Sequence, residues 1–539
     1  MASGSRICAR REYRFVLAFS AVALIVTSIP YTLGAALATE DRVFGGFVYA
    51  VEDGYAYLAH MREGAGGAWL FTLPYTPEPH PPRLFYLLHL LLGKLATLLP
   101  GSDLTARMVW VYHGARVIFG LGLLLTVYRF LAAFTARVAV RRLAWLMVTF
   151  GGGLGWLLLA LGRPGWLGSM PLDLILPEGF TFLVLYGFPH IALARTLLLW
   201  GILFLLRGWE ATCPGPRLRW ALLTGLLWLA MGLIVPFYVA VAWAVTGAAW
   251  LALMLRERRL LWREGLPAGV AALLSAPVVL YSAWVFTNDP VYATWAAQNQ
   301  ILSPHPLHYL AAYGVPLLLA IFAVREVWRD GRPGWLPLAW VAVVPLLVYL
   351  PFNLQRRLVE GVQVPLSLLA AWGVVKISNV KHQTSNVRSG LVVGVTLVGL
   401  SLTNVLLVAG NCLALRGRPA PIYRDAGEIA ALDWLGNRVE SDDVVLAAYE
   451  TGNYLPARVG ARAFVGHGPE SVRAEEKKAL VTRFFAGTSG DDWCCNLLAE
   501  YGVDWVFWGP AERALGGFQV SCLNPVYDAA GYVVFQVDD

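Results

Sequence analysis

The sequence predicts a polytopic α-helical membrane protein of about 11–13 transmembrane helices, followed by a small C-terminal extracytoplasmic α/β domain. Hydrophobic residues make up 58% of the 539-residue chain and charged residues only 14%, whereas a soluble protein carries roughly 25% charged residues. Apolar runs near the about 20 residues that span a bilayer recur along the chain. From Asn411 onward the composition changes, because acidic residues outnumber basic ones 18 to 11 although the whole chain carries a net charge of +7.

The apolar runs place the expected membrane spans within residues 1–410, and residues 411–539 form the expected exterior domain. The first outer loop, 38–83, is much longer than most of the others. A further apolar run, 84–100, either lies in the membrane interface or re-enters, or else it crosses and inverts the later loops. The expected spans lie at 15–37, 109–131, 143–161, 186–206, 220–235, 237–254, 266–286, 308–324, 335–352, 362–376 and 390–410.

Basic residues set the expected orientation. The stretch RICARREYR precedes the first span, and a cleaved signal peptide is the alternative, but its apolar core would exceed the usual 7–15 residues. Later basic clusters fall on alternate loops, which favours a cytoplasmic position for those loops. We therefore expect a multi-pass plasma-membrane protein with a cytoplasmic N-terminus and an extracytoplasmic C-terminal domain. The sequence pI of 9.1 reflects the basic residues of these loops, so it does not imply nucleic-acid binding. The sequence leaves the oligomeric state open.

The long outer loop contains two adjacent acids, Glu52 and Asp53, followed by Tyr55 and Tyr57. The stretch VYAVEDGYAYLAHMREG can form a helix interrupted at Gly54. Neighbouring residues do not share a helical face, so the two acids are expected to have different roles. Acids in a loop are more often simply solvated, but this loop gathers acids, His and Tyr against a membrane. The pair is therefore a candidate active-site feature.

Basic residues near the outer ends of spans are the second group of candidates. Arg116 lies about two turns inside an apolar run, where a charge is costly and marks a functional site by default, with snorkelling to the surface as the alternative. His190 and Arg195 begin another span. An arginine pair, Arg356 and Arg357, suits a phosphate because the guanidinium fork matches its oxygens. A lipid-headgroup anchor is the alternative for that pair.

The C-terminal region reads as an α/β domain. RDAGEIAALDWLGNRV predicts a helix, whereas DVVLAAY, VDWVFWG, FQVSCL and GYVVFQV predict strands. ETGNYLPARVGARAFVGHG is expected to be a glycine-rich loop with a possible second strand, and its Gly466-His467-Gly468 segment either faces the membrane site or forms a plain turn. Disulfides and free thiols are both compatible with the four cysteines here, which are Cys412, Cys494, Cys495 and Cys522.

The order of these features resembles the GT-C superfamily of integral membrane glycosyltransferases, in particular the bacterial relatives of the protein O-mannosyltransferases and the aminoarabinose transferase. The similar features are the anchor, the long loop with Glu52-Asp53, HPPRLFYLLHLLLGKL, FPHIALART, QRRLVEGVQVPLSLLAAWG, and the C-terminal EIAALDWLGNRVESDDVVLAAYETGNYLPARVGARAFVGHG. The chain departs from the mannosyltransferases by having Glu-Asp where they have Asp-Glu. This leaves open which of the two acids is catalytic.

The resemblance implies transfer of a hexosyl or pentosyl group from a polyprenyl-phosphate-linked donor to an acceptor at the outer membrane face. Attack at the anomeric carbon needs a carboxylate to accept the acceptor's proton, and the departing phosphate needs positive charge. Asp53 is the expected base, with Glu52 orienting it or binding a cation. A divalent metal is left open, and Asp53, Glu52 and His80 are its expected ligands if one is used.

The remaining candidates are expected to bind the substrate, while the apolar spans supply a groove for the isoprenoid chain. The partners are therefore a polyprenyl-phosphate sugar donor and membrane lipid; the sugar and the acceptor stay open. A polytopic transporter and a non-catalytic scaffold with an exterior binding domain are the alternatives, although transporters tend to carry polar groups near the midplane and inverted repeats. The expected substrate-binding residues are Tyr55, Tyr57, His80, Arg116, His190, Arg195, Arg356, Arg357 and Glu360.

Overall fold

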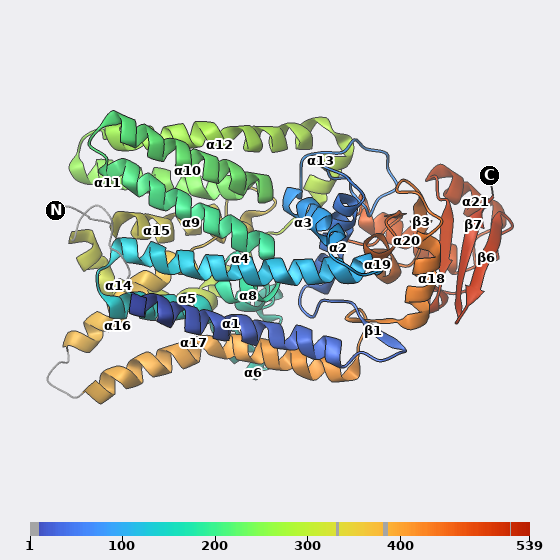
Figure 1. Cartoon of the computed structure of the whole chain (residues 1–539), viewed down its shortest axis with the longest axis horizontal. Helices are drawn as coiled ribbons and strands as arrows, with labels where there is room; N and C mark the ends of the chain where they lie inside the picture. The colour runs from blue at the N-terminus through green and yellow to red at the C-terminus, as the bar shows by residue number, and fades with distance from the viewer. Residues whose placement is uncertain (1–9, 330–333, 381–385, 518, 539) are drawn as a thin grey trace. The chain divides into compact units, whose positions relative to one another are not determined.

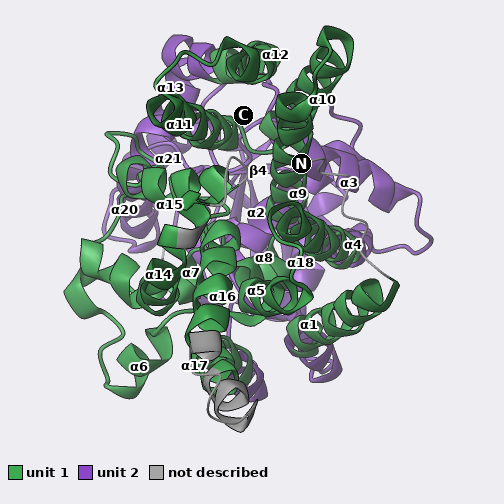
Figure 2. Cartoon of the chain, turned by 90° about the vertical axis from the view of Figure 1, so that its left-hand side faces the viewer, with its two compact units in different colours: residues 1–29, 114–282, 301–410 green, residues 30–113, 283–300, 411–539 purple. Residues whose placement is uncertain are grey.

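The computed structural model describes residues 10–329, 334–380, 386–517 and 519–538. The chain is mostly helical and ends in a small sheet (Figure 1). It forms two compact units, each built from three segments (Figure 2). Unit 1 comprises residues 1–29, 114–282 and 301–410, and unit 2 comprises residues 30–113, 283–300 and 411–539. The first outer loop and the C-terminal region therefore belong to the same unit, while the domain boundary at residue 410 stays a prediction.

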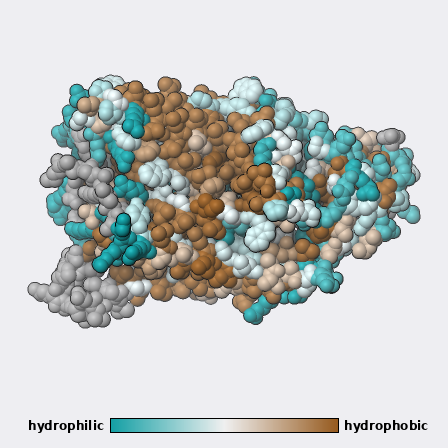
Figure 3. All heavy atoms as spheres, viewed as in Figure 1, coloured by the Kyte–Doolittle hydropathy of each residue, from teal (hydrophilic) through white to brown (hydrophobic). Residues whose placement is uncertain are grey.

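Eight helices in the described part of the chain are long and apolar enough to cross a membrane. On the face shown in Figure 3, hydrophobic residues gather over the long helices of unit 1. The chain is a polytopic α-helical membrane protein, as the composition predicted. The eight helices are α1 (Arg10–Ala36), α4 (Leu104–Phe134), α9 (Pro189–Glu210), α10 (Pro214–Ile234), α11 (Tyr238–Glu257), α12 (Trp262–Asn288), α14 (Pro306–Arg329) and α17 (Asn386–Ala414).

Several expected spans are shorter or broken. The run 335–352 forms a 13-residue helix, α15 (Trp335–Leu347), and 362–376 lies in α16 (Gln363–Val380). The run 143–161 is not one helix, because three glycines separate α5 (Val138–Phe150) from α6 (Gly155–Ala160). The Gly153 N–H donates to the carboxylate of Asp173 at 2.8 Å, which gives the interrupted backbone a partner. Shorter elements connect the helices of unit 1: η1 (Trp166–Gly168), α7 (Leu172–Ile175), α8 (Thr181–Gly187) and η3 (Gln355–Val359).

The apolar run 84–100 forms a short helix, α3 (Leu87–Thr97). Its 11 residues rise roughly 17 Å, about half of the roughly 30 Å hydrocarbon core of a bilayer. The helix packs instead on α2 (Val51–Ala65). Glycine is needed at this crossing, because a Cβ on Gly93 would lie 1.8 Å from the Met61 carbonyl oxygen. The run therefore supports the first outer loop and is too short to cross.

A two-stranded ribbon joins the first outer loop to the C-terminal region. Strand β1 (Arg42–Phe44) pairs antiparallel with β2 (Tyr423–Asp425). The Tyr423 hydroxyl also donates to the Gly34 carbonyl at 2.8 Å. Segments nearly 400 residues apart in the sequence are thus held in one unit, and this pairing positions the acids of the loop.

The C-terminal region contains the expected α/β fold. Its five-stranded sheet has the order β4-β3-β5-β7-β6, in which β3 pairs parallel with β4 and β5, and β7 pairs antiparallel with β5 and β6. The strands are β3 (Val444–Leu446), β4 (Arg462–Ala463), β5 (Trp505–Trp508), β6 (Leu523–Ala529) and β7 (Tyr532–Val537). The helices are α18 (Ala426–Gly436), α19 (Tyr449–Arg458), α20 (Ala474–Phe485), α21 (Asp491–Glu500) and α22 (Pro510–Arg513).

Two local expectations for this region were wrong. The stretch expected to be a glycine-rich loop begins with α19, which packs on α2. FQVSCL is not a strand in the described residues, because β6 starts only at Leu523. The open question about the cysteines is answered, since Cys495 and Cys522 form a disulfide, whereas Cys494 and Cys412 are free thiols.

Candidate functional site

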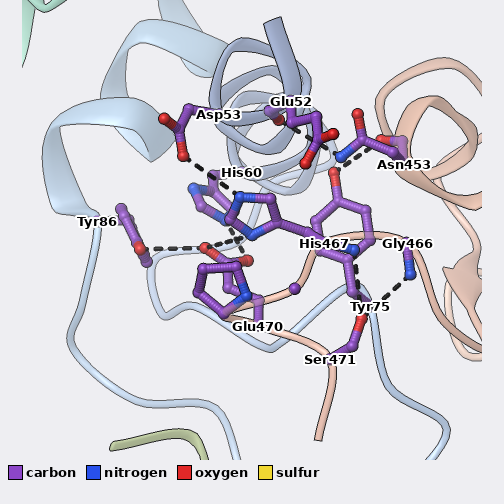
Figure 4. Close-up of polar contacts among 12 residues, drawn as sticks. Glu52, Asp53, His60, Tyr75, Tyr86, Asn453, Gly466, His467, Glu470 and Ser471 are labelled. Carbon is purple, nitrogen blue, oxygen red and sulfur yellow. Dashed lines mark hydrogen bonds and ion pairs between the residues drawn. The ribbon is translucent and has the colours of Figure 1, made fainter. Parts of the chain in front are cut away.

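The two adjacent acids lie in the first turn of α2, where the helix dipole favours negative charge. The helix is not interrupted at Gly54, contrary to expectation. Glycine is required there for packing, since a Cβ would lie 2.4 Å from the ring of Phe47. The continuous helix sends Glu52 and Asp53 in different directions from one turn (Figure 4).

Asp53 is held by a histidine from the C-terminal region. Its Oδ1 lies 3.3 Å from Nε2 of His467 (Figure 4). The His467 side chain is 7% exposed, while the Asp53 side chain is 46% exposed. The pair therefore joins a buried imidazole to a carboxylate that a bound molecule can still reach.

The segment that carries His467 is a fixed loop. The backbone N–H groups of Gly466 and His467 both donate to Oγ of Ser471, at 3.1 and 3.2 Å. The next N–H, from Gly468, donates to the hydroxyl of Tyr449 at 2.9 Å. These bonds orient the imidazole towards Asp53, so the Gly466-His467-Gly468 segment is more than a plain turn.

A buried glutamate lies on the far side of the imidazole. Oε1 of Glu470 accepts a hydrogen bond from the Tyr86 hydroxyl at 3.1 Å and lies 3.9 Å from Nδ1 of His467. Its Oε2 lies 3.0 Å from Nε2 of His60, which is fully buried on α2. Asp53, His467, Glu470 and His60 thus alternate acid and imidazole in one row (Figure 4).

The electrostatics of this row favour a charged His467. Burial lowers the pKa of the His467 imidazole, but the hydrogen bond with Asp53 and the charge of Glu470 outweigh burial and raise it. Burial raises the pKa of the Glu470 carboxyl, whereas His60, His467 and Tyr86 lower it by more. Both shifts stabilise the ionised forms, so the row acts as a buried charge network whose exposed end is Asp53.

Glu52 has different partners from Asp53, in agreement with the expectation that the two acids differ. Its Oε2 accepts a hydrogen bond from the Tyr449 hydroxyl at 3.2 Å, and its backbone carbonyl accepts one from the side-chain amide of Asn453 at 3.4 Å. Burial and the charge of Glu52 raise the pKa of Tyr449 to about 12. Glu52 is exposed and joins α2 to α19, whereas Asp53 is the acid that lies beside the buried imidazole of His467.

The tyrosines and histidine predicted to bind the substrate have structural partners in unit 2. The hydroxyl of buried Tyr55 donates to the Pro421 carbonyl at 2.5 Å, and Tyr57 stacks on the ring of His89 at a centroid distance of 4.7 Å. His80 uses both ring nitrogens, since Nδ1 donates to the Glu78 carbonyl at 2.7 Å and Nε2 accepts from the Leu73 N–H at 2.8 Å.

The expected metal ligands are therefore not gathered. With both nitrogens of His80 occupied, that ring has no lone pair left for a cation. Within the described ranges, no group of three or more His, Cys, Asp or Glu side chains is arranged to hold a metal ion. Metal dependence consequently stays a question for experiment, with Glu52 and Asp53 as the carboxylates that such an ion would use.

In unit 1, three of the predicted substrate-binding residues are buried and paired within the fold. Arg116 donates to the Leu185 carbonyl and to the Ser28 hydroxyl, each at 2.8 Å. Nε of Arg195 donates to Glu360 at 2.5 Å, and both side chains are fully buried. These groups anchor helices of unit 1 to one another, and their burial opposes direct contact with a substrate.

The other predicted cations of unit 1 are more accessible. Arg357 is 38% exposed and lies 3.5 Å from Oε1 of Glu178. Arg356 precedes it in η3 and is half-buried. His190 is the second residue of α9, where its ring lies beside that of Phe188. The arginine pair of η3 therefore remains the most accessible cationic group among those the sequence singled out.

Sequence reasoning missed His60 and Glu470 and did not assign a role to His467. A signal for His60 was present, because it follows Asp53 by seven positions and two helical turns return to the same face. Glu470 follows His467 by three positions, a spacing that occurs too often to be specific. Only the folded chain brings the two histidine-bearing segments together.

No protein-family model matches the sequence, and no curated protein matches it. Among solved structures, ArnT from Cupriavidus metallidurans bound to undecaprenyl phosphate has a TM-score of 0.50 and 13% identity, and the match covers 97% of each chain. The apo state of that protein has a TM-score of 0.49 and 14% identity, over 97% of this chain and 98% of that one. The Archaeoglobus fulgidus oligosaccharyltransferase has a TM-score of 0.47 and 10% identity, over 93% and 71%. The chain therefore shares the fold of ArnT, and the resemblance to the GT-C membrane glycosyltransferases is confirmed at the level of fold.

Proposed function

We propose that the chain is a membrane glycosyltransferase that moves a sugar from a polyprenyl-phosphate-linked donor to an acceptor on the outer face of the membrane. The observation that carries the proposal is the half-exposed Asp53 carboxylate held 3.3 Å from buried His467. The fold shared with ArnT, a protein whose structure holds undecaprenyl phosphate, supports a lipid-linked donor. The N-terminus is then cytoplasmic and residues 411–539 are extracytoplasmic.

In the proposed reaction, Asp53 accepts the proton of the acceptor hydroxyl as its oxygen attacks the anomeric carbon of the sugar. The bond between that carbon and the phosphate oxygen breaks, and the lipid phosphate leaves with the bonding electrons. A positioned carboxylate typically contributes 10²–10⁴-fold to such a step. His467 is a positioning residue, because its hydrogen bond fixes the Asp53 carboxylate.

The proposal assigns Arg356 and Arg357 to the phosphate of the donor. Of the arginines singled out, these two are partly exposed to solvent. Arg116 and Arg195 are buried and make their contacts inside unit 1. Planar guanidinium groups match phosphate oxygens and keep their charge at every accessible pH. They would stabilise the negative charge that develops on the departing phosphate.

The test is sugar transfer in membranes that contain the chain, assayed with a panel of radiolabelled polyprenyl-phosphate sugars. Asp53→Asn should lower the rate 10²–10⁴-fold, while Glu52→Gln should keep most of the activity. Asp442→Asn is the matched control, because Asp442 is a 93% exposed aspartate of the same unit. Equal transfer by wild type and Asp53→Asn would remove Asp53 from the mechanism. No transfer from any donor would favour the transporter or scaffold alternatives.

A further inference from the structure

Unit 1 contains a groove that the proposed reaction does not use. It has a volume of about 740 Å³ and lies along the middle of α11 and the first half of α12. Its walls are apolar and aromatic, with Trp243, Trp250, Trp262, Leu266 and Leu273 among them. Trp262 and Leu273 are 71% and 75% exposed. Both helices are candidate membrane spans, so this surface faces hydrocarbon chains.

The walls of the groove are fixed by hydrogen bonds. The indole N–H of Trp243 donates to Oγ of Ser275 at 3.0 Å, and that of Trp250 donates to the Leu261 carbonyl at 2.9 Å. The hydroxyl of Thr246 donates to the carbonyl of Ala242 at 2.7 Å. Because these polar groups are satisfied by the protein, the lining offers an apolar surface that is already formed.

The open space in the groove comes from two glycines. A Cβ on Gly247 or Gly269 would meet no atom within 4 Å, although both residues line the groove. The space is therefore left by missing side chains and is not filled by neighbouring helices. A methyl group at either position would therefore enter open space.

Two arginines line the end of the groove. Arg217, near the start of α10, and Arg263, in the first turn of α12, are both lining residues. Nη2 of Arg217 donates to the Ala211 carbonyl at 2.6 Å. Of the other arginines, Arg219 lies over the ring of Trp220, and Arg259 pairs with Glu257 at 2.8 Å. The acid next to Arg263 in the chain, Glu264, is not a lining residue. The groove therefore joins an apolar surface to a positive end.

We propose that this α11–α12 groove binds one anionic glycerophospholipid, with an acyl chain against the tryptophans and the headgroup phosphate between Arg217 and Arg263. The bilayer supplies this ligand at the surface where the groove lies. Charge complementarity favours an anionic lipid over a zwitterionic one, because the cationic part of a zwitterionic headgroup would face the two guanidinium groups. The site would be a structural lipid site, separate from the proposed donor site, and it does not depend on the proposed reaction.

The test is native mass spectrometry of the purified full chain after exchange into micelles containing dioleoyl-phosphatidylglycerol or dioleoyl-phosphatidylcholine. We expect one retained phosphatidylglycerol and weaker retention of phosphatidylcholine. Removing both charges with Arg217→Gln and Arg263→Gln should weaken phosphatidylglycerol binding about 30-fold, because each basic side chain near an anionic lipid contributes about fivefold. Arg219→Gln is the matched control and should change little.

A second variant tests the groove independently of charge. Gly269→Phe should remove the tightly retained lipid while leaving the melting temperature of the delipidated protein close to that of the wild type. Equal retention of the two phospholipids by the wild type would overturn the proposal. An Arg219→Gln effect as large as that of the double variant would do the same, since it would indicate general surface charge. Displacement by equimolar undecaprenyl phosphate would assign the groove to the polyprenyl lipid instead.

Discussion

Replacing His467 tests the central feature of the candidate site. His467→Ala removes the hydrogen bond to Asp53 without touching the carboxylate itself. A hydrogen bond to a charged group is worth about 1.5–3 kcal/mol, and the lower end applies here because the bond is 3.3 Å long and Asp53 is 46% exposed. A loss of about 1.5 kcal/mol corresponds to roughly a tenfold decrease in kcat.

The pH profile separates positioning from a simple folding defect. The pKa of His467 is raised in the folded protein, so its charged form contributes below that pKa and is lost as the pH rises through it. The wild type should therefore lose activity on the alkaline side. His467→Gln keeps a donor N–H but does not titrate, so it should recover part of the rate and lack this alkaline decrease.

The assay is steady-state transfer of a radiolabelled sugar, with kcat and KM measured across pH for single and double variants. Asp53→Asn combined with His467→Ala should be no slower than Asp53→Asn alone, because the histidine acts through the aspartate. His305→Ala, at an exposed histidine, is the control. Independent, multiplicative losses in the double variant would refute the positioning role, as would an unchanged alkaline limb in His467→Gln.

Three further predictions concern stability. Burial raises the pKa of Glu63 from 4.5 to about 8, so the folded protein binds a proton that the unfolded chain releases, and it loses stability as the pH rises between these values. Glu63→Gln should remove that loss, which is about 3 kcal/mol at most at pH 7. The variant should therefore have a higher melting temperature than the wild type above pH 7 and nearly the same one near pH 4. Replacing Cys495 and Cys522 with serine should cost about 3–4 kcal/mol, from the 27-residue separation of the disulfide; equal melting temperatures with and without reductant in the wild type would contradict this. Gly93→Ala should lower the free energy of unfolding by at least about 1–3 kcal/mol, because its Cβ would collide with the backbone of α2. Gly114→Ala is the control and should be neutral, because nothing lies within 4 Å of its Cβ position. A neutral Gly93→Ala would show that α2 and α3 can separate at little cost.

The membrane architecture was predictable because long apolar helices are a local property of the sequence. The same property gave a wrong expectation at 143–161, which is broken at three glycines, and the Gly153 N–H donates to Asp173. The role of 84–100 was left open by the sequence, and in the structure this run is the packing partner of α2. The acids of α2 were singled out because their loop gathers acids, His and Tyr against a membrane, and their catalytic role stays a prediction.

The partners of those acids were not predictable in the same way. His467 contacts Asp53 across 414 positions, and no local pattern indicates which distant histidine will be used. Arg195 was selected as a basic residue near the outer end of a span, but its charge is paired with Glu360, 165 residues away. A buried charge is evidence for a partner, and the sequence alone does not tell whether the partner is a substrate or another side chain.

The pairing of β1 with β2 has a consequence for how the protein matures. Residues 42–44 leave the ribosome long before residues 423–425, so β1 stays without its partner strand while every intervening helix is synthesised. Contacts of such high sequence separation form late in folding. The acids of α2 can meet the Gly466-His467-Gly468 segment only after the last quarter of the chain has been made, which keeps an incompletely synthesised chain from presenting a formed candidate site.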